Sequence, residues 1–513
     1  MRESIHSIVR CVLLMKRVFS HPLTALATGL CLRLFFVLQF PQTSGDTALY
    51  EQFAANWLKR SIYGMAIDGV VKPTDMRVPG YPAYLAVVYA LTGQTGETAR
   101  RWVMFGQIAV DLVTCLAIAT LAALVVRLSA SSWSPRTAFR GALWLVATCP
   151  FTANYVAVPL TETFALFFTS MALLLIVLLF ARFRGRSLFE IGGRFLSNAG
   201  VPLLAGLLGL TLGVGTLFRP ETPLVLAVMW LVAVPYLVMR RELRRAAQLV
   251  VISGVTCFLP LVPWGIRNAV TLHEVQFLAP EYSNLPGEII PYGFMKWERT
   301  WLYRFRDVYL VSWNLNGEQI NLDDIPSYAF DSTEEKERVG AILDAYNQTQ
   351  TLTPEEDAAF GAIGRERTAR HPLRTYLEVP ALRVLTMWFT PRIELLPFSG
   401  KLRPVSEAWQ QDPVDFSVTV GFFVLNVVYV VLGVWGGVRL WRWSPALRPV
   451  LAVFLAYTVI RTAFLTTLET PEPRYVLECF PVLLVLAAFA FLGRPEAPDY
   501  SHLTAPRRVR GEL

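Results

Sequence analysis

The sequence predicts an all-α protein that crosses a membrane many times. Of its 513 residues, 54% are hydrophobic and only 17% are charged, and the mean hydropathy is +0.43. A soluble domain carries about 25% charged and about 45–50% apolar residues. The composition therefore excludes an ordinary soluble enzyme, a disordered chain and a disulfide-rich secreted domain. The net charge of +8 does not indicate a nucleic-acid partner, because membrane proteins concentrate Lys and Arg in cytoplasmic loops.

A spanning helix needs about 20 mostly apolar residues at a rise of ~1.5 Å each. Ten segments satisfy this, although Pro150 interrupts the third. The first lacks a small-x-small cleavage site and more spans follow it, so we interpret it as a retained anchor rather than a signal peptide. The predicted spans are residues 23–40, 102–126, 141–158, 163–183, 199–218, 222–239, 249–266, 416–440, 447–468 and 475–492.

Lys and Arg gather in alternate connections, and this bias predicts the orientation of the chain. The short loops between the basic ones hold single basic residues, Arg219 and Arg474. Both termini are therefore expected on the cytoplasmic side of the membrane, in agreement with an even number of spans. The basic segments contain Arg2, Arg10, Lys16 and Arg17, then Arg127, Arg136 and Arg140, then Arg182, Arg184, Arg186 and Arg194, then Arg240, Arg241, Arg244 and Arg245, then Arg439, Arg442 and Arg448, and finally Arg494, Arg507, Arg508 and Arg510.

Two long outer segments divide the chain into three expected parts. A transmembrane module, residues 1–266, includes the first outer segment, residues 41–101. An outer region, residues 267–415, precedes the C-terminal spans and tail, residues 416–513. Within that region, Ser332 and Thr353-Pro354 are typical helix starts, so we expect two amphipathic helices on the outer face.

Carboxylates and arginines recur at the outer ends of the predicted helices. This grouping indicates a site that opens at the outer membrane–water boundary, within reach of lipid and aqueous substrates. Each residue also has a structural interpretation: Asp46 and Glu162 as helix caps, Arg219 with Glu221 as a pair across a turn, and Arg267 as an interfacial anchor beside a Trp. The full set is Asp46, Arg77, Glu162, Arg219, Glu221, Arg267, Glu469, Glu472 and Arg474.

Seven short motifs follow one another along nearly the whole chain. In this order they resemble the bacterial GT-C glycosyltransferases, the group that includes dolichyl-phosphate-mannose protein mannosyltransferase-like and aminoarabinose transferase-like enzymes. The motifs are G-D-x-x-x-Y at 45–50, R-x-P-G-Y-P at 77–82, T-E-T at 161–163, R-P-E at 219–221, P-W-x-x-R-N at 263–268, His371-Pro372 before an amphipathic run with Tyr376, and E-x-R-Y at 472–475.

The resemblance implies an enzyme that transfers a sugar from a polyprenyl-phosphate carrier to an acceptor lipid, glycan or protein, with inversion, on the outer face. Asp46 matches the acidic residue of the first loop and is predicted to act as general base. Glu162 matches the second acidic position and would orient the acceptor or help to bind a cation. The predicted phosphate-binding residues are Arg474, Arg267, Arg77 and Arg219, since Arg has a fixed fork of donors. The predicted supporting residues are Tyr50, Tyr81, Glu221, Glu472 and Tyr475.

The need for a metal is left open by the sequence. Many relatives carry two adjacent acids in the first loop, whereas Thr47 follows Asp46 here. The sequence has no Cys-x-x-Cys and no His pair at helical spacing, which argues against a tight zinc site. A loosely held Mg²⁺ or Mn²⁺ would need only oxygen ligands.

Three charged residues lie deep inside predicted spans, well away from the span ends: Arg33, Asp111 and Arg461. Each costs roughly 2.5–3.5 kcal/mol at mid-bilayer. All three lie at a similar depth, so we predict that Asp111 pairs with Arg33 or with Arg461 as a structural tie.

Two other functions remain open at this stage. A transporter or flippase of a lipid-linked sugar would place its key charges at the midplane and show repeated halves, and no internal repeat is visible. A non-catalytic scaffold would not require Asp46 and Glu162 in this order. An enzyme requires that Asp46, Glu162 and an arginine converge at the outer face.

Overall fold

The computed structural model describes residues 21–129, 132–185, 200–280, 282 and 288–494. Apart from two short strands, the regular elements of this part of the chain are helices. Seven helical segments are long and apolar enough to cross a membrane, and two shorter apolar helices, Val201–Thr216 and Leu224–Met239, accompany them. The prediction of an all-α polytopic protein is confirmed.

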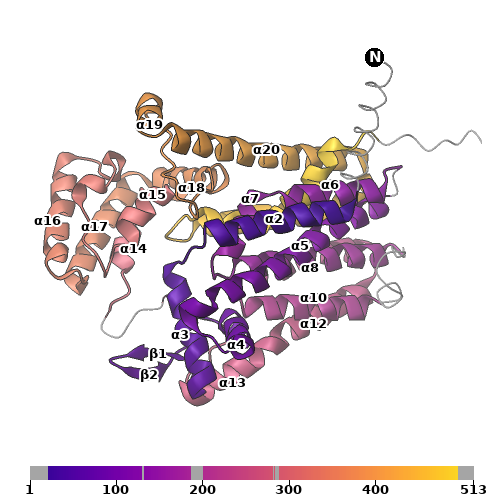
Figure 1. Ribbon diagram of the computed structural model, residues 1–513, viewed down its shortest axis with the longest axis horizontal. Coiled ribbons are helices and arrows are strands. Elements are labelled where there is room, and N and C mark those ends of the chain that lie inside the picture. The colour runs from indigo at the N-terminus through magenta and orange to yellow at the C-terminus, as the bar shows by residue number, and fades with distance from the viewer. Residues whose placement is uncertain (1–20, 130–131, 186–199, 281, 283–287, 495–513) are drawn as a thin grey trace, which may run out of the picture.

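The long helices run side by side in one bundle (Figure 1). Helix α5 packs against α6 and α8, α10 against α8 and α12, and α20 against α22. The helices of the bundle are α2 (Pro22–Gln39), α5 (Arg100–Ser129), α6 (Pro135–Ala147), α8 (Glu162–Phe183), α10 (Val201–Thr216), α11 (Leu224–Met239), α12 (Leu243–Phe258), α13 (Val262–Thr271), α20 (Pro413–Trp443), α21 (Arg448–Thr466) and α22 (Phe480–Ala488).

The third predicted span is not one continuous helix. Helix α6 ends at Ala147, and Pro150 begins the short helix α7 (Pro150–Ala153), which is followed by a 3₁₀ turn, Asn154–Ala157. Proline lacks a backbone N–H and clashes with the preceding turn, so it ends a helix and is tolerated at the start of the next. The bent segment carries Tyr155 and Pro159 toward the outer end of α8.

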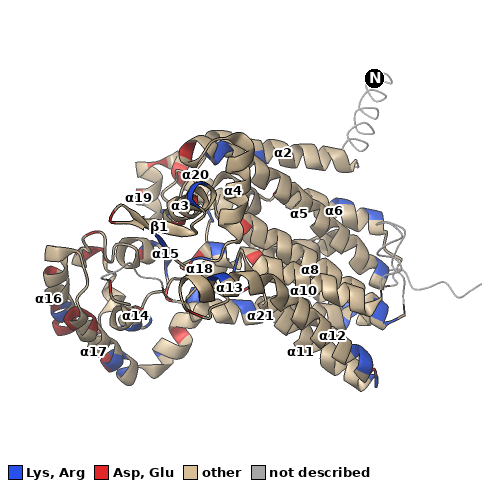
Figure 2. Cartoon of the chain, turned by 90° about the horizontal axis from the view of Figure 1, so that it is seen from below, with Lys and Arg blue, Asp and Glu red and all other residues tan. Residues whose placement is uncertain are grey.

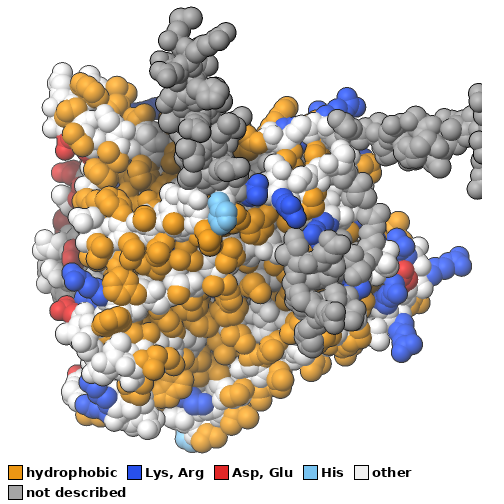
Figure 3. All heavy atoms as spheres, turned by 45° about the vertical axis from the view of Figure 1, so that its right-hand side comes forward, with side chains coloured by type: hydrophobic (Ala, Val, Ile, Leu, Met, Phe, Trp, Pro, Cys, Tyr) orange, Lys and Arg blue, Asp and Glu red, His pale blue; other side chains and the backbone are white. Residues whose placement is uncertain are grey.

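The surface of the bundle has the character of a membrane protein. Figure 3 shows hydrophobic side chains spread across its side, and Figure 2 shows Lys and Arg gathered at one end of the helices. Exposed apolar residues such as Val431 and Trp435 on α20 are suited to contact lipid. The chain is an integral membrane protein. Its orientation stays a prediction, and the basic residues of both terminal tails before residue 21 and after 494 lie outside the described residues.

The predicted pairing of Asp111 is confirmed. The Arg33 Nε atom lies 2.5 Å from Asp111 Oδ2, and both side chains are buried. The remaining guanidinium N–H groups of Arg33 donate to the carbonyls of Gly29 and Ala147, at 2.9 and 2.8 Å, and to the Cys115 sulfur. This pair ties α2 to α5, while Arg461 binds other partners described below.

The first outer segment holds a helix, a hairpin and a second helix. Helix α3 (Gly45–Arg60) and helix α4 (Gly80–Thr92) pack together. Between them, β1 (Gly64–Ile67) and β2 (Val70–Pro73) form an antiparallel pair. Its turn residues Asp68 and Gly69 have φ values of 53° and 78°. Our reading of the sequence missed this hairpin, although Asp-Gly between apolar residues is a strong signal for it.

Residues 289–363 of the outer region form a helical unit with its own core, at the left of Figure 1. Ser332 and Thr353 cap the two expected helices by accepting backbone N–H bonds from Glu335 and Glu356. The second of these helices packs against α14 around the buried Trp297, and the first packs against the second. The elements of this region are α14 (Tyr292–Glu298), α15 (Phe305–Asp307), α16 (Thr333–Thr349), α17 (Pro354–Arg370), α18 (Val379–Trp388) and α19 (Val405–Gln411).

Glu298 makes the stability of the outer unit depend on pH. Burial raises the pKa of this carboxyl to about 8, against an ordinary value of 4.5. The folded state then holds a proton that the unfolded state releases, so stability falls as the pH rises from 4.5 to 8. The Glu298→Gln variant should melt a few degrees above the wild type at pH 8 and close to it at pH 5. Melting in detergent at both pH values checks this, with the exposed Glu337→Gln as control. Equal differences at both pH values would contradict it.

Candidate active site

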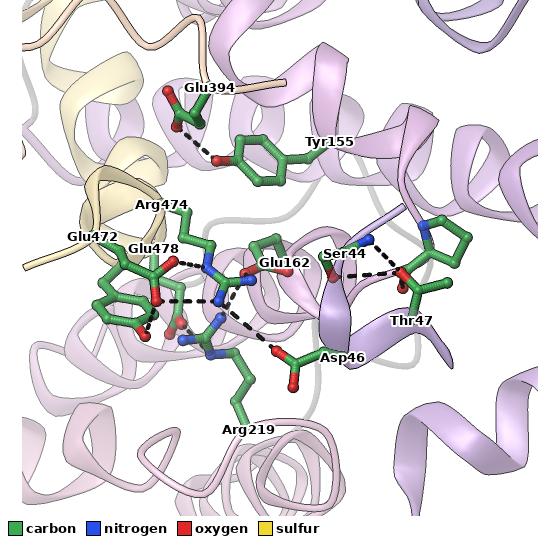
Figure 4. Close-up of polar contacts among 12 residues, drawn as sticks. Ser44, Asp46, Thr47, Tyr155, Glu162, Arg219, Glu394, Glu472, Arg474 and Glu478 are labelled. Carbon is green, nitrogen blue, oxygen red and sulfur yellow. Dashed lines mark hydrogen bonds and ion pairs between the residues drawn. The ribbon is translucent and has the colours of Figure 1, made fainter. Parts of the chain in front are cut away.

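Five carboxylates and four guanidinium groups form one continuous network of ion pairs at the helix ends that are predicted to face outward. Figure 4 shows the part of this network around Arg474 and Arg219. The charged groups come from segments far apart in the sequence: the first outer segment, the start of α8, the turn before α11, helix α21 and the segment before α22. We call this network the outer charge cluster. Its members are Asp46, Arg77, Glu162, Arg219, Glu221, Arg461, Glu472, Arg474 and Glu478.

Asp46 lies in the first turn of α3 and does not cap it. The N-cap is Ser44, whose backbone N–H donates to Thr47 Oγ1 at 3.1 Å. The Thr47 hydroxyl in turn donates to the Pro159 carbonyl, 3.2 Å away. The residue that follows Asp46 thus holds α3 against the segment before α8. The Asp46 carboxylate forms ion pairs instead, with Oδ1 3.0 Å from Arg77 Nη2 and Oδ2 3.8 Å from Arg474 Nη2.

Arg474 joins the two predicted catalytic acids. Its Nη1 atom lies 3.5 Å from Glu162 Oε1 while its Nη2 atom faces Asp46. Glu472, two residues earlier, accepts both Nε and Nη2 of Arg474, at 2.6 and 3.2 Å, and the Tyr475 hydroxyl as well. Asp46 lies in the first turn of α3, and Glu162 is the first residue of α8. The partly positive N-terminal ends of these two helices stabilise the negative charge of the carboxylates that face the Arg474 guanidinium.

Arg219 is the second centre of the cluster. It lies 3.2 Å from Glu162 Oε1, 2.9 Å from Glu221 Oε1 and 3.0 Å from Glu478 Oε1. Glu478 also accepts Arg461 Nη2 at 2.6 Å. The predicted turn pair of Arg219 with Glu221 exists, but both residues are also part of the wider network. Glu162 Oε2 is buried without a hydrogen-bond partner, so one oxygen of this acid is available to a ligand.

At Glu221 and Arg219, the effect of neighbouring opposite charges on the pKa is larger than the effect of burial. Burial would raise the pKa of Glu221, but Arg219 and Arg461 lower it to about 2. Burial would likewise lower the pKa of Arg219, and the surrounding carboxylates raise it instead. For Tyr50, burial and the nearby Asp46 both raise the pKa. Glu221 and Arg219 are therefore held in their charged forms, and Tyr50 is held neutral.

The R-x-P-G-Y-P motif fastens the first outer segment to the rest of the site. Arg77 reaches Asp46, and the Gly80 N–H donates to the Leu217 carbonyl at 2.7 Å, two residues before Arg219. The Tyr81 hydroxyl donates to Gln107, whose amide donates to carbonyls of the segment before α8. Tyr50 packs edge to face on Tyr81, with ring centres 5.1 Å apart. Each polar residue of the motif thus fixes one wall of the site.

The Arg267 guanidinium is bound to backbone carbonyls of the first outer segment. Its guanidinium donates to the carbonyls of Tyr63 and Thr74, at 2.7 and 2.9 Å, and stacks near Trp264. It makes no ion pair with the carboxylates of the outer charge cluster. The P-W-x-x-R-N motif therefore holds the hairpin of the first outer segment, and the role of Arg267 in phosphate binding stays a prediction.

Three residues of the site region were not found from the sequence. Glu478 falls inside the last predicted span, and a charge within a span is by itself a signal of function. Arg461 was grouped with Asp111, whereas it binds Glu478 and Glu221. Glu394 comes from the second outer segment, where no motif marked it.

The carboxylates do not form a divalent-cation site. Within the described residues, no group of three or more His, Cys, Asp and Glu side chains is placed to hold a metal ion. The guanidinium of Arg474 lies between Asp46 and Glu162, where a bridging cation would have to be. Thr47, at the position of a second acid, is used to hold α3. We therefore derive no chemical step through a metal.

Comparisons with known proteins find similar structures only. Neither a family model nor a curated protein matches the sequence. One similar structure is the Archaeoglobus fulgidus oligosaccharyltransferase tethered with an acceptor peptide, at 12% identity and a TM-score of 0.48, covering 91% of this chain and 49% of that one. The chain thus spans about half the length of that protein.

A second similar protein is ArnT from Cupriavidus metallidurans. Its apo structure has 14% sequence identity to this chain and a TM-score of 0.39. Its structure with bound undecaprenyl phosphate has 13% identity and a TM-score of 0.38. Each match covers 91% of this chain and 77% of that one.

Gly80 is expected to be essential for the geometry of the site. A Cβ atom there would lie 2.4 Å from the Leu217 carbonyl oxygen, so Gly80→Ala must separate two walls of the cluster. We expect a loss of about 1–3 kcal/mol in stability. Gly141→Ala is the matched control, because a Cβ at that helical position meets nothing within 4 Å. Melting of the two variants side by side checks this, and an unchanged Gly80→Ala would show that the close approach is not required.

Proposed function

We propose that this protein is a GT-C type glycosyltransferase that takes a sugar from a polyprenyl-phosphate carrier and transfers it to an acceptor at the outer face of the membrane. The observation that carries the proposal is the position of Arg474 between Asp46 and Glu162. A phosphate-binding donor and two carboxylates meet there at the membrane–water boundary. The acceptor is a hydroxyl-bearing lipid, glycan or protein, and the membrane is the inner membrane of a bacterial cell envelope.

The proposed reaction is a direct displacement with inversion. The acceptor O–H gives its proton to Asp46 as the acceptor oxygen bonds to the anomeric carbon, and the bond from that carbon to the phosphate oxygen breaks. The electron pair leaves with the polyprenyl phosphate, whose growing negative charge is stabilised by arginine. Asp46 suits the base because its Oδ2 atom is only loosely held, 3.8 Å from Arg474, and its side chain is partly exposed.

The other members of the cluster have supporting roles. Arg474, with Arg77 and Arg219, binds the carrier phosphate, and Glu162 orients the acceptor with its free oxygen. Glu472, Tyr475, Glu221, Tyr50 and Tyr81 hold these groups in place. Without a bound donor, the carboxylates of the cluster pair with the arginines. When the donor binds, its phosphate replaces a carboxylate as a partner of Arg474.

The proposal predicts transfer that depends on Asp46. Proteoliposomes holding the protein are given radiolabelled undecaprenyl-phosphate sugars, with membrane extract as acceptor. Asp46→Asn should lower the transfer rate by about 10²–10⁴-fold, the usual contribution of a general base. Asp68→Asn is the matched control, since this exposed turn residue has a left-handed backbone that Asn also accepts.

Other outcomes of that assay separate the alternatives. Transfer that Asp46→Asn leaves unchanged would remove the assigned base while keeping the enzyme. No transfer from any donor, together with movement of labelled carrier across the bilayer, would contradict the enzyme and favour a flippase.

The proposal also predicts which arginine binds the carrier. Arg474→Lys keeps the charge and loses the planar fork, so affinity for undecaprenyl phosphate in detergent should fall by about tenfold or more. Arg267→Lys should leave that affinity within about twofold, because Arg267 holds backbone carbonyls away from the cluster. A larger loss of affinity for Arg267→Lys than for Arg474→Lys would contradict the role of Arg474 and favour Arg267, the other phosphate-binding residue predicted from the sequence.

A further inference from the structure

A carboxylate–phenol pair lies beside the outer charge cluster. Glu394 Oε1 accepts the Tyr155 hydroxyl at 2.8 Å. Figure 4 shows this pair on one side of the Arg474 guanidinium, with Asp46 and Arg219 on the other side. Tyr155 is close enough to Glu162 and Arg474 to interact electrostatically with both charges. The pair therefore borders the same space as the proposed phosphate site.

The backbone that carries Glu394 is rigidly held. Arg392, two residues earlier, is buried and donates to Asn426 on α20, to the Met387 carbonyl and to the carbonyl of Pro473. The last of these contacts is next to Arg474 in the chain. Ile393 is buried in a cluster with residues of α2, α5 and the turn that holds Tyr155. Glu394 is thus fixed relative to Arg474 and is half-buried.

Glu394 differs from the carboxylates of the outer charge cluster in that no ion pair within the described residues holds it, although Arg392 is near enough to interact with its charge. Within the described residues it forms no ion pair with Arg, Lys or His, and its recorded hydrogen-bond partner is the neutral Tyr155. An unpaired carboxylate retains oxygen lone pairs that can accept further O–H or N–H donors. Such a half-buried carboxylate repels phosphate and favours a ligand that donates hydrogen bonds.

We propose that Glu394 and Tyr155 form a subsite that binds hydroxyl groups of the sugar to be transferred. This inference rests on the proposed function, because it places the sugar next to a phosphate held by Arg474. The sugar is covalently joined to that phosphate, so its hydroxyls must lie within a few bond lengths of the Arg474 side chain. Glu394 accepts from a sugar hydroxyl, and the Tyr155 oxygen, still donating to Glu394, accepts from a second one.

The position of the pair separates the sugar from the acceptor. Asp46, the proposed base, lies across Arg474 from Glu394. Displacement with inversion requires the acceptor and the leaving phosphate on opposite faces of the anomeric carbon, while the ring hydroxyls project sideways from that line. Glu394 therefore serves sugar recognition, and it takes no proton in the reaction.

The test compares carriers with and without a sugar. Affinities of the full-length protein in nanodiscs are measured for undecaprenyl phosphate and for undecaprenyl phosphate bearing glucose, mannose or galactose. Glu394→Ala should weaken the best sugar-bearing ligand by about 10–100-fold, the value of a hydrogen bond to a charged group. Affinity for undecaprenyl phosphate alone should stay within twofold. Glu394→Gln, which keeps one acceptor oxygen, should fall between, and the exposed Glu407→Gln is the matched control.

The outcomes distinguish this inference from the function on which it rests. If the wild type does not bind undecaprenyl phosphate, the proposed function itself is contradicted. If it binds this lipid but Glu394→Ala weakens both kinds of ligand equally, or neither, the sugar subsite is overturned and the proposed function stands. A wild type that binds no sugar-bearing ligand more tightly than the bare carrier also overturns the subsite.

Discussion

Burial of charge at the outer ends of the helices is the constraint on which the site depends. A carboxylate or guanidinium taken out of water is costly unless it is paired and hydrogen-bonded. The chain meets this cost by joining five acids to four arginines drawn from distant segments. These ion pairs join separate helices and loops, so the helices that carry these residues must stay in register. The same pairing that stabilises the helix ends also assembles the site.

Neutralisation within the cluster also governs what the site can bind. Arg474 and Arg219 each touch more than one carboxylate, so an incoming phosphate can replace one acid without leaving the arginine unpaired. Glu394 stands outside this exchange because its partner is a phenol. One side of Arg474 is thus suited to an anion and its leaving group, and the other to hydroxyl donors. A lipid-linked sugar phosphate has both properties in one molecule.

Local patterns in the sequence predicted most of the fold and part of the site. Hydropathy located the helices, and cap residues such as Ser332 and Thr353 located two helix starts, because these signals act within a few residues. Asp46 and Glu162 were recognised by their place at outer helix ends. The ion-pair partners were not predictable in the same way, because they depend on how separate segments come together in space. The contact of Arg461 on α21 with Glu478 before α22 is one example. Glu394 had no local pattern at all.

The central claim is that the outer charge cluster receives the carrier phosphate at Arg474. The most direct measurement is a cryo-electron microscopy structure of the protein in nanodiscs with undecaprenyl phosphate. The account predicts density for the phosphate within hydrogen-bond distance of the Arg474 guanidinium, with Asp46 released from that arginine. Phosphate bound at Arg267 or among the basic residues at the other end of the bundle, with Arg474 still joined to Asp46 and Glu162, would contradict it.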